Sequence, residues 1–159
     1  MGQHERVNMA KSIEIVARGV CVQAGKVLVC RSVKHGHHYL PGGHVEWGET
    51  SPEALRREWL EELKVPCEVG DFLGVLEQSY GLAGERVAEI SLVFRVDCPA
   101  LSASRADTAE PDNIDFAWVP VEQLDSVRLL PAAIRKAIPA WVASPGHAAA
   151  YLQGQGEEV

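Results

Sequence analysis

The chain has 159 residues, and 15 Lys and Arg against 22 Asp and Glu give a formal net charge of −7. The length predicts one domain of ordinary size, and the apolar (47%) and charged (23%) fractions exclude disordered and fibrous classes. A net acidic chain is a poor candidate for binding polymeric nucleic acid or an anionic membrane surface, whereas a small anionic ligand bridged by a cation is compatible with it.

The sequence predicts neither a membrane span nor a secretory signal. Charged residues such as Arg18, Arg135 and Lys136 interrupt the longest apolar runs before the roughly 20 residues that a spanning helix needs. Residues 1–12, MGQHERVNMAKS, lack the apolar core of a signal peptide. The four cysteines are far apart in the chain, so we expect reduced thiols and a cytoplasmic protein; they are Cys21, Cys30, Cys67 and Cys98.

The first third of the chain predicts a β-hairpin followed by a loop. Residues 1–11 are polar, and we expect a flexible N-terminus there. The segments 12–23 and 26–31 are rich in strand-forming residues and flank an Ala-Gly turn, which indicates a hairpin. A loop with several histidines then leads to Pro-Gly-Gly at 41–43, a strong turn signal.

A helix is predicted over 51–64, and Pro66 is expected to stop it. Two N-caps fit its start. Ser51 can cap the helix with Pro52 at the first helical position, or Thr50 can do so with Glu53 completing a capping box.

The remaining chain predicts further strands and one more helix. These segments are 67–80, 86–97 and 114–119 as strands, and 129–138 as a helix that Pro139 ends or kinks. Strands outnumber helices, which favours an α/β fold in which helices cover a mixed sheet. We expect one domain over 12–143 and a C-terminal tail over 144–159.

The helix at 51–64 has two distinct faces. Leu55, Trp59 and Leu63 fall within one arc, which Leu60 widens, and this arc is predicted to be buried. The three acidic residues of the other arc repel one another, and two of them lie in the last turn, where the helix dipole is also unfavourable; they are Glu58, Glu61 and Glu62.

Two explanations fit this acidic arc. A solvated acidic surface is the usual fate of such a run. A divalent cation would instead remove the repulsion, and carboxylate oxygens with a backbone carbonyl suit Mg²⁺ or Mn²⁺. The preceding Pro-Gly-Gly turn, which can approach a ligand closely, favours the cation site.

The segment 43–65, GHVEWGETSPEALRREWLEELKV, resembles the signature of the Nudix hydrolases, G-x5-E-x7-R-E-U-x-E-E-x-G-U, where U is apolar. Trp59 and Val65 fill the apolar positions, and Lys64 replaces the signature glycine. The charged and glycine positions match at Gly43, Glu49, Arg57, Glu58, Glu61 and Glu62.

The resemblance implies an α/β/α sandwich with a mixed β-sheet, in which the signature forms a catalytic loop–helix–loop. It implies a metal, Mg²⁺ with Mn²⁺ as a substitute, held by Glu58, Glu62 and the Gly43 carbonyl. Glu61 would be a ligand or the general base. Arg57 would orient a carboxylate, and Glu49 would bind a further metal or fix the loop; we count Glu61 and Arg57 as the candidate catalytic residues.

The resemblance also implies hydrolysis of the pyrophosphate bond in a nucleoside diphosphate linked to another group. ADP-ribose, a nucleotide sugar, a dinucleoside polyphosphate and a modified nucleoside triphosphate all stay open as substrates. So do a homodimer and a catalytically silent nucleotide-binding or regulatory module, although the complete acidic set favours an enzyme. We expect a small nucleotide as the partner, with neither polymeric nucleic acid nor a membrane.

Four residues outside the charged positions of the signature are candidate substrate contacts. His37 belongs to a histidine-rich loop that could touch phosphate, and a zinc site there is the less favoured alternative. Tyr39 could stack on a base, although packing under the loop is favoured. Trp47 is either a lid or a core residue, and Glu110 either supplies a further carboxylate or lies in a solvated loop.

The end of the helix allows two accounts of Lys64. The signature glycine would adopt a left-handed conformation, which Lys adopts at a cost of roughly 1 kcal/mol. We favour the alternative, in which Lys64 continues the helix and Pro66 ends it, because the residue before a proline avoids helical angles.

Overall fold

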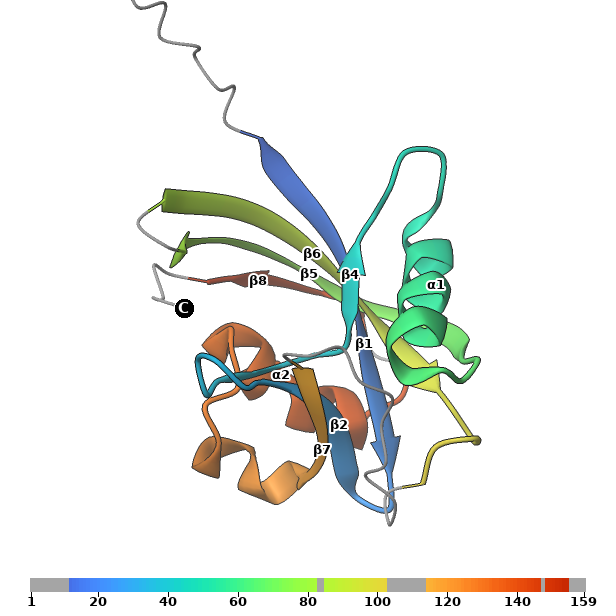
Figure 1. Cartoon of the computed structure of the whole chain (residues 1–159). Helices are drawn as coiled ribbons and strands as arrows, with labels where there is room; N and C mark the ends of the chain where they lie inside the picture. Colours follow the sequence, from blue (N-terminus) through green and yellow to red (C-terminus); the bar gives the residue numbers. More distant parts are fainter. Residues whose placement is uncertain (1–11, 83–84, 103–113, 147, 155–159) are drawn as a thin grey trace, which may run out of the picture.

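The computed structural model describes residues 12–82, 85–102, 114–146 and 148–154, which form one mixed sheet with a helix on each face (Figure 1). In this part of the chain the sheet has eight strands in the order β3-β2-β1-β6-β5-β8, with β4 paired to β1 and β7 to β2. The strands are β1 (Ile13–Gln23), β2 (Lys26–Ser32), β3 (His38–Tyr39), β4 (Gly42–His44), β5 (Glu68–Leu82), β6 (Glu85–Asp97), β7 (Ile114–Pro120) and β8 (Ala150–Gln153). The helices are α1 (Ser51–Leu63), the 3₁₀ helix η1 (Val121–Ser126) and α2 (Ala132–Ala143).

The strand β1 joins the two halves of the sheet. It is antiparallel to β2 and to β4 and parallel to β6, where Ala17 lies beside Leu92. Side chains alternate along a strand, so Ala17 and Cys21 pack in the cluster under α1, while Val20 packs in the cluster under α2. Two cores therefore lie on opposite faces, which confirms the predicted sandwich of a mixed sheet between helices.

Helix α1 buries the predicted face only in part. Leu55, Trp59 and Leu63 are buried, whereas Leu60 is 54% exposed, so the buried arc is narrower than predicted. The large Trp59 ring fits because β1 carries a glycine beneath it. A Cβ on Gly19 would lie 2.6 Å from Cζ3 of Trp59, which leaves no room for a side chain there.

The start of α1 uses the second of the two predicted caps. Thr50 is the N-cap, and its backbone N–H and its hydroxyl both donate to the Glu53 carboxylate at 2.7 Å.

The prediction for the second helix was wrong at both ends. The helix α2 begins at Ala132, because Pro131 has an extended conformation and forms the N-cap. It then continues through Pro139 to Ala143, with the Ser144 N–H donating to the Ala140 carbonyl. A proline removes one helix hydrogen bond, and the buried side chains before and after it, Ile138 and Trp141, hold the helix to the sheet.

The predicted C-terminal tail contributes a strand to the sheet. Residues 150–153 form β8 parallel to β5, with Ala150 beside Gly74. A Cβ on Gly74 would lie 2.4 Å from the Ala150 carbonyl oxygen, so this glycine permits the approach of β8. Sequence patterning missed this strand because four residues are too few to show alternation.

The four cysteines are buried free thiols, as predicted. No helix in the described ranges is long and apolar enough to span a membrane.

The prediction that Lys64 continues the helix was wrong. Helix α1 ends at Leu63, and Lys64 has φ 58° and ψ 21°, the left-handed conformation of the signature glycine. The Lys64 ammonium donates to the Glu61 carbonyl at 2.6 Å, so the side chain occupies one of the carbonyls left unpaired at the helix end.

Replacing Lys64 with glycine is therefore expected to stabilise the fold by about 0.5–1 kcal/mol, because relief of left-handed strain exceeds the entropy lost and the amine contact removed. Thermal melting measures this as a rise of about 1–4 °C. Lys64→Ala is the control: it removes the amine but keeps the strain, and we expect it to destabilise. A lower melting temperature for Lys64→Gly would show that the amine contact outweighs the strain.

Candidate active site

The Pro-Gly-Gly turn is held against β1 by its backbone. Gly42 has φ 136°, and a Cβ there would lie 2.0 Å from the Ala17 carbonyl oxygen, so only glycine permits this packing. Nη1 of Arg18 donates to the carbonyls of Leu40 and Gly42, each at 3.2 Å. These contacts hold the Pro-Gly-Gly turn and its backbone carbonyls beside α1.

Arg57 is the centre of the charged cluster on α1. Its Nε and Nη2 form a two-pronged contact with Glu49, at 3.2 and 2.7 Å. Its Nη1 donates to Glu58 at 3.0 Å and to Glu61 at 3.4 Å, and Nη2 also donates to the His44 carbonyl at 3.0 Å. One guanidinium thus fixes the loop before α1 and three of the four signature glutamates.

Glu49 serves the loop as well as Arg57. Its carboxylate accepts from the Glu46 backbone N–H at 2.9 Å. The hydrogen bond from Arg57 and then that from Glu46 lower the pKa of Glu49 below its usual value. The hydrogen bond to Glu49, as the largest cause, and the hydrogen bond to Glu58 raise the pKa of Arg57.

Gly43 lies directly against the carboxylate of Glu58. A Cβ at this position would be 2.3 Å from Cδ of Glu58, so a backbone without a side chain is needed for the carboxylate to lie there. The turn therefore lies against a carboxylate, and carboxylate oxygens are the donor type that hard divalent cations prefer.

Glu62 lies in a partly buried position beside Glu58. Burial is the largest cause that raises the pKa of Glu62 to about 7, and the charge of Glu58 adds to it, while Arg18 opposes it. A carboxyl held in this environment at neutral pH would be stabilised by a nearby cation.

Within the described ranges, no three His, Cys, Asp or Glu side chains are arranged as a complete metal cage. The reason at this site is that Glu49, Glu58 and Glu61 direct oxygens toward Arg57. Glu58, Glu62 and the backbone of Gly43 carry only oxygen donors at this site. Such a donor set fits a hard divalent cation that binds through one or two carboxylates and keeps water or phosphate as its other ligands.

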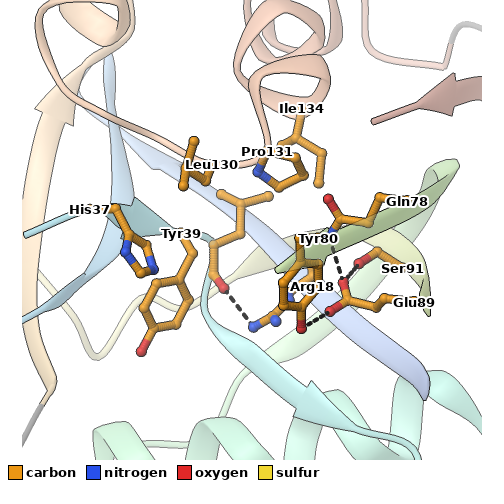
Figure 2. A pocket seen from close by; sticks show the side chains of 11 residues that line it. Arg18, His37, Tyr39, Gln78, Tyr80, Glu89, Ser91, Leu130, Pro131 and Ile134 are labelled. Carbon is orange, nitrogen blue, oxygen red and sulfur yellow. Dashed lines mark hydrogen bonds between the residues drawn. The ribbon is translucent and has the colours of Figure 1, made fainter. Parts of the chain in front are cut away.

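A cavity of about 210 Å³ opens on the other face of β1, next to this cluster (Figure 2). Its polar wall comes from β1, β5 and β6, and its apolar wall comes from the segment that leads into α2. The lining residues are Arg18, His37, Tyr39, Leu40, Gln78, Tyr80, Glu89, Ser91, Leu130, Pro131 and Ile134.

The structure places two of the four candidate substrate contacts in the cavity and one on the exposed surface. His37 and Tyr39 line the cavity, and burial lowers the pKa of His37, so it faces the cavity as a neutral group. Trp47 is fully exposed, so it is not a core residue, and it does not line the cavity. Glu110 lies outside the described residues.

Two cavity residues, Arg18 and Glu89, escaped the sequence analysis as functional candidates. Each is a charged residue whose neighbours two positions away on the same strand face are uncharged, Val16 and Val20 for Arg18 and Val87 and Ser91 for Glu89, and that pattern is the signal that could have found them. The charge of Arg18 lowers the pKa of both Glu62 and Tyr80, so it acts on the acidic cluster and on the cavity.

A family model described as the NUDIX domain matches residues 14–141. The chain is 37% identical over 118 residues to the nucleoside triphosphatase NudI of Enterobacter sp. (strain 638), covering 66% of this chain and 80% of that protein. It is 30% identical over 118 residues to the human 8-oxo-dGDP phosphatase NUDT18, covering 72% of this chain and 34% of that protein.

Two solved structures show the same fold at low sequence identity. The MutT protein from Methanosarcina mazei Go1 aligns with a TM-score of 0.66 and 23% identity, over 87% of this chain and 99% of that one. A UDP-X diphosphatase aligns with a TM-score of 0.62 and 20% identity, over 93% and 70% of the two chains.

Proposed function

The chain belongs to the Nudix hydrolase family and is a hydrolase that acts on nucleotides, and from that premise we propose that it hydrolyses a phosphoanhydride bond of a nucleoside triphosphate with Mg²⁺ as cofactor. The relatives named as nucleoside triphosphatases support the triphosphate, with 37% identity in one and 34% in another. We further propose that the catalytic domain comprises residues 12–143, and that β8 (Ala150–Gln153) from the expected tail adds a strand to its sheet.

The observation that carries the proposal is the position of Glu58 between Gly43, Arg57 and Glu62. We assign Glu58, Glu62 and the Gly43 carbonyl as the residues that hold Mg²⁺. Their all-oxygen donor set favours Mg²⁺ or Mn²⁺ over Zn²⁺, which prefers nitrogen and sulfur ligands. A divalent cation, when bound, neutralises phosphate oxygens and activates water toward phosphorus.

The chain's own residues have separate roles around that cation. Arg57 holds Glu58 in place, and Glu49 fixes the guanidinium and the loop rather than binding a metal. Glu61 is exposed and makes the longest of the contacts to Arg57, 3.4 Å, so we assign it as the base that accepts a proton from the attacking water. The Arg18 guanidinium lines the cavity and carries a positive charge, so it is suited to contact the phosphates of the substrate.

We expect the purified full chain to release phosphate or pyrophosphate from nucleoside triphosphates faster than it hydrolyses ADP-ribose, a nucleotide sugar or a dinucleoside polyphosphate. A phosphate-release screen with Mg²⁺, with and without added pyrophosphatase, measures both the substrate class and the bond that is cleaved. A faster reaction with one of the other three classes would replace the proposed substrate. No hydrolysis of any class would instead favour a silent binding module.

Chelation followed by metal return tests the cofactor. The chelated protein should lose activity, and Mg²⁺ or Mn²⁺ should restore it better than Zn²⁺. Best recovery with Zn²⁺ would contradict the oxygen-only site and favour a role for the histidine-rich loop.

A further inference from the structure

The floor of the cavity is a carboxylate that the proposed catalytic steps do not use. Glu89 is 5% exposed and lies on β6, on the face that packs toward α2. Along the same face the next inward residues are Ser91 and Val93, both buried. A carboxylate placed in such surroundings is costly unless hydrogen-bond donors surround it.

Three donors meet Glu89 (Figure 2). The side-chain amide of Gln78, its direct partner across β5 and β6, donates to Oε1 at 3.1 Å, and the Ser91 hydroxyl donates to the same oxygen at 2.5 Å. The Tyr80 hydroxyl donates to Oε2 at 3.2 Å. Burial and the charge of Glu89 raise the pKa of Tyr80 to about 12, which keeps its hydroxyl protonated.

These contacts leave hydrogen-bonding capacity on one side of the carboxylate. A carboxylate has about four lone-pair positions, and the three donors account for three of them. Oε1 accepts twice and Oε2 accepts once from the residues that line the cavity. The remaining position on Oε2 can accept a hydrogen bond from a donor on a ligand, and an acceptor placed there would be repelled.

The opposite wall and the charged neighbour restrict the ligand further. Leu130, Pro131 and Ile134 form an apolar wall across from the polar floor, which suits a flat heterocycle. Arg18 lines the cavity, and its Nη1 donates to the Leu40 and Gly42 carbonyls of the turn beside α1, so it links the cavity to the side of the acidic cluster. A nucleotide can therefore place its base in the cavity and its phosphates toward α1.

We propose that Glu89 determines base specificity and selects guanine through the 2-amino group, which donates to the free position on Oε2 while the neighbouring N1–H, also a donor, lies beside it. The inference rests on the proposed nucleotide hydrolysis and extends it to the kind of base. In guanine these two donors are neighbours, so a carboxylate that faces them meets no adjacent acceptor. The donor edges of adenine, cytosine and uracil each place an acceptor beside the donor, which the Glu89 charge disfavours.

Binding of nucleoside monophosphates, measured by calorimetry on the metal-free full chain, tests this without requiring turnover. The wild-type protein should bind GMP about 10–100-fold more tightly than IMP, which lacks only the 2-amino group, because a hydrogen bond to a charged partner is lost. AMP should bind at least as weakly as IMP. Equal affinities for GMP, IMP and AMP would overturn the proposal, and this comparison requires no variant.

Glu89→Gln provides the second measurement. An amide can donate to the 2-oxo group of xanthine, so the preference for GMP over XMP should fall at least 10-fold. Glu77→Gln is the matched control, because it makes the same change at an exposed position of β5, next to Gln78 in the chain. The preference of this variant for GMP over XMP should equal that of the wild type. A folded Glu89→Gln protein with the wild-type preference would show that Glu89 is a structural acceptor only.

Binding and turnover distinguish failure of this inference from failure of the proposed function. A GMP preference without hydrolysis of any nucleotide would overturn the proposed function and leave the role of Glu89 standing. Hydrolysis of nucleotides with a kcat/KM independent of the base would overturn the role of Glu89 and leave the proposed function standing.

Discussion

Replacing Glu62 with glutamine is expected to lower kcat by about three orders of magnitude or more while the fold stays intact. The amide keeps the size of the side chain but removes the charge of one of the two carboxylates that we assign to Mg²⁺. Steady-state kinetics at saturating Mg²⁺ measures the loss, and circular dichroism checks the fold. The matched control is Glu68→Gln, an exposed position at the start of β5, which should retain wild-type kinetics.

The same variant has a second, opposite effect on stability in the absence of metal. Burial raises the pKa of Glu62 from 4.5 to about 7, so the folded state binds its proton more tightly than the unfolded state does. The contribution of Glu62 to the free energy of unfolding of the metal-free protein should therefore fall as pH rises from about 4.5 to about 7, and should then stay at the lower level.

Glu62→Gln should lack this fall and be more stable than the wild type by about 1–2 kcal/mol at pH 8, less than the full shift implies because the group is only partly buried. Urea denaturation at pH 5 and pH 8 in chelator measures both proteins. A variant with near wild-type kcat would remove Glu62 from the metal site. Parallel pH dependences would show that the Glu62 carboxyl is not destabilised by its surroundings.

Replacing Gly43 with alanine is expected to lower kcat by about 100-fold or more with little change in stability. The new Cβ would lie 2.3 Å from Cδ of Glu58, and the Glu58 side chain can rotate away because it is flexible. The fold would then survive, but the carboxylate would leave the position beside the turn, and a displacement of about 1 Å in a catalytic group can cost 10²-fold.

Two further glycine substitutions separate this effect from a general effect of alanine. Gly70→Ala should be silent, because its Cβ would meet nothing closer than 3.7 Å. Gly42→Ala should instead destabilise the fold, because its Cβ would lie 2.0 Å from a backbone oxygen that cannot move aside. Wild-type kcat for Gly43→Ala would show that Glu58 does not need to lie against the turn.

Local spacing carried much of the information about the acidic site. Residues three and four apart on a helix share a face, so the placement of Glu58, Glu61 and Glu62 on one side of α1 follows from their spacing alone. The capping pair Thr50 and Glu53 and the hairpin of β1 and β2 are local in the same sense, since each forms within a few residues.

The sequence alone determined the fold class, the helix that carries the acidic residues and their common face, because periodicity and turn residues act over short distances. Only the tertiary structure decided what the distant strands bring together. The pairing of β1 with β6 and of β5 with β6 places Arg18, Gln78 and Glu89 around one cavity. The tertiary structure also showed the left-handed Lys64 and the strand β8. The cavity and β8 depend on contacts between segments far apart in the chain, which no local pattern specifies.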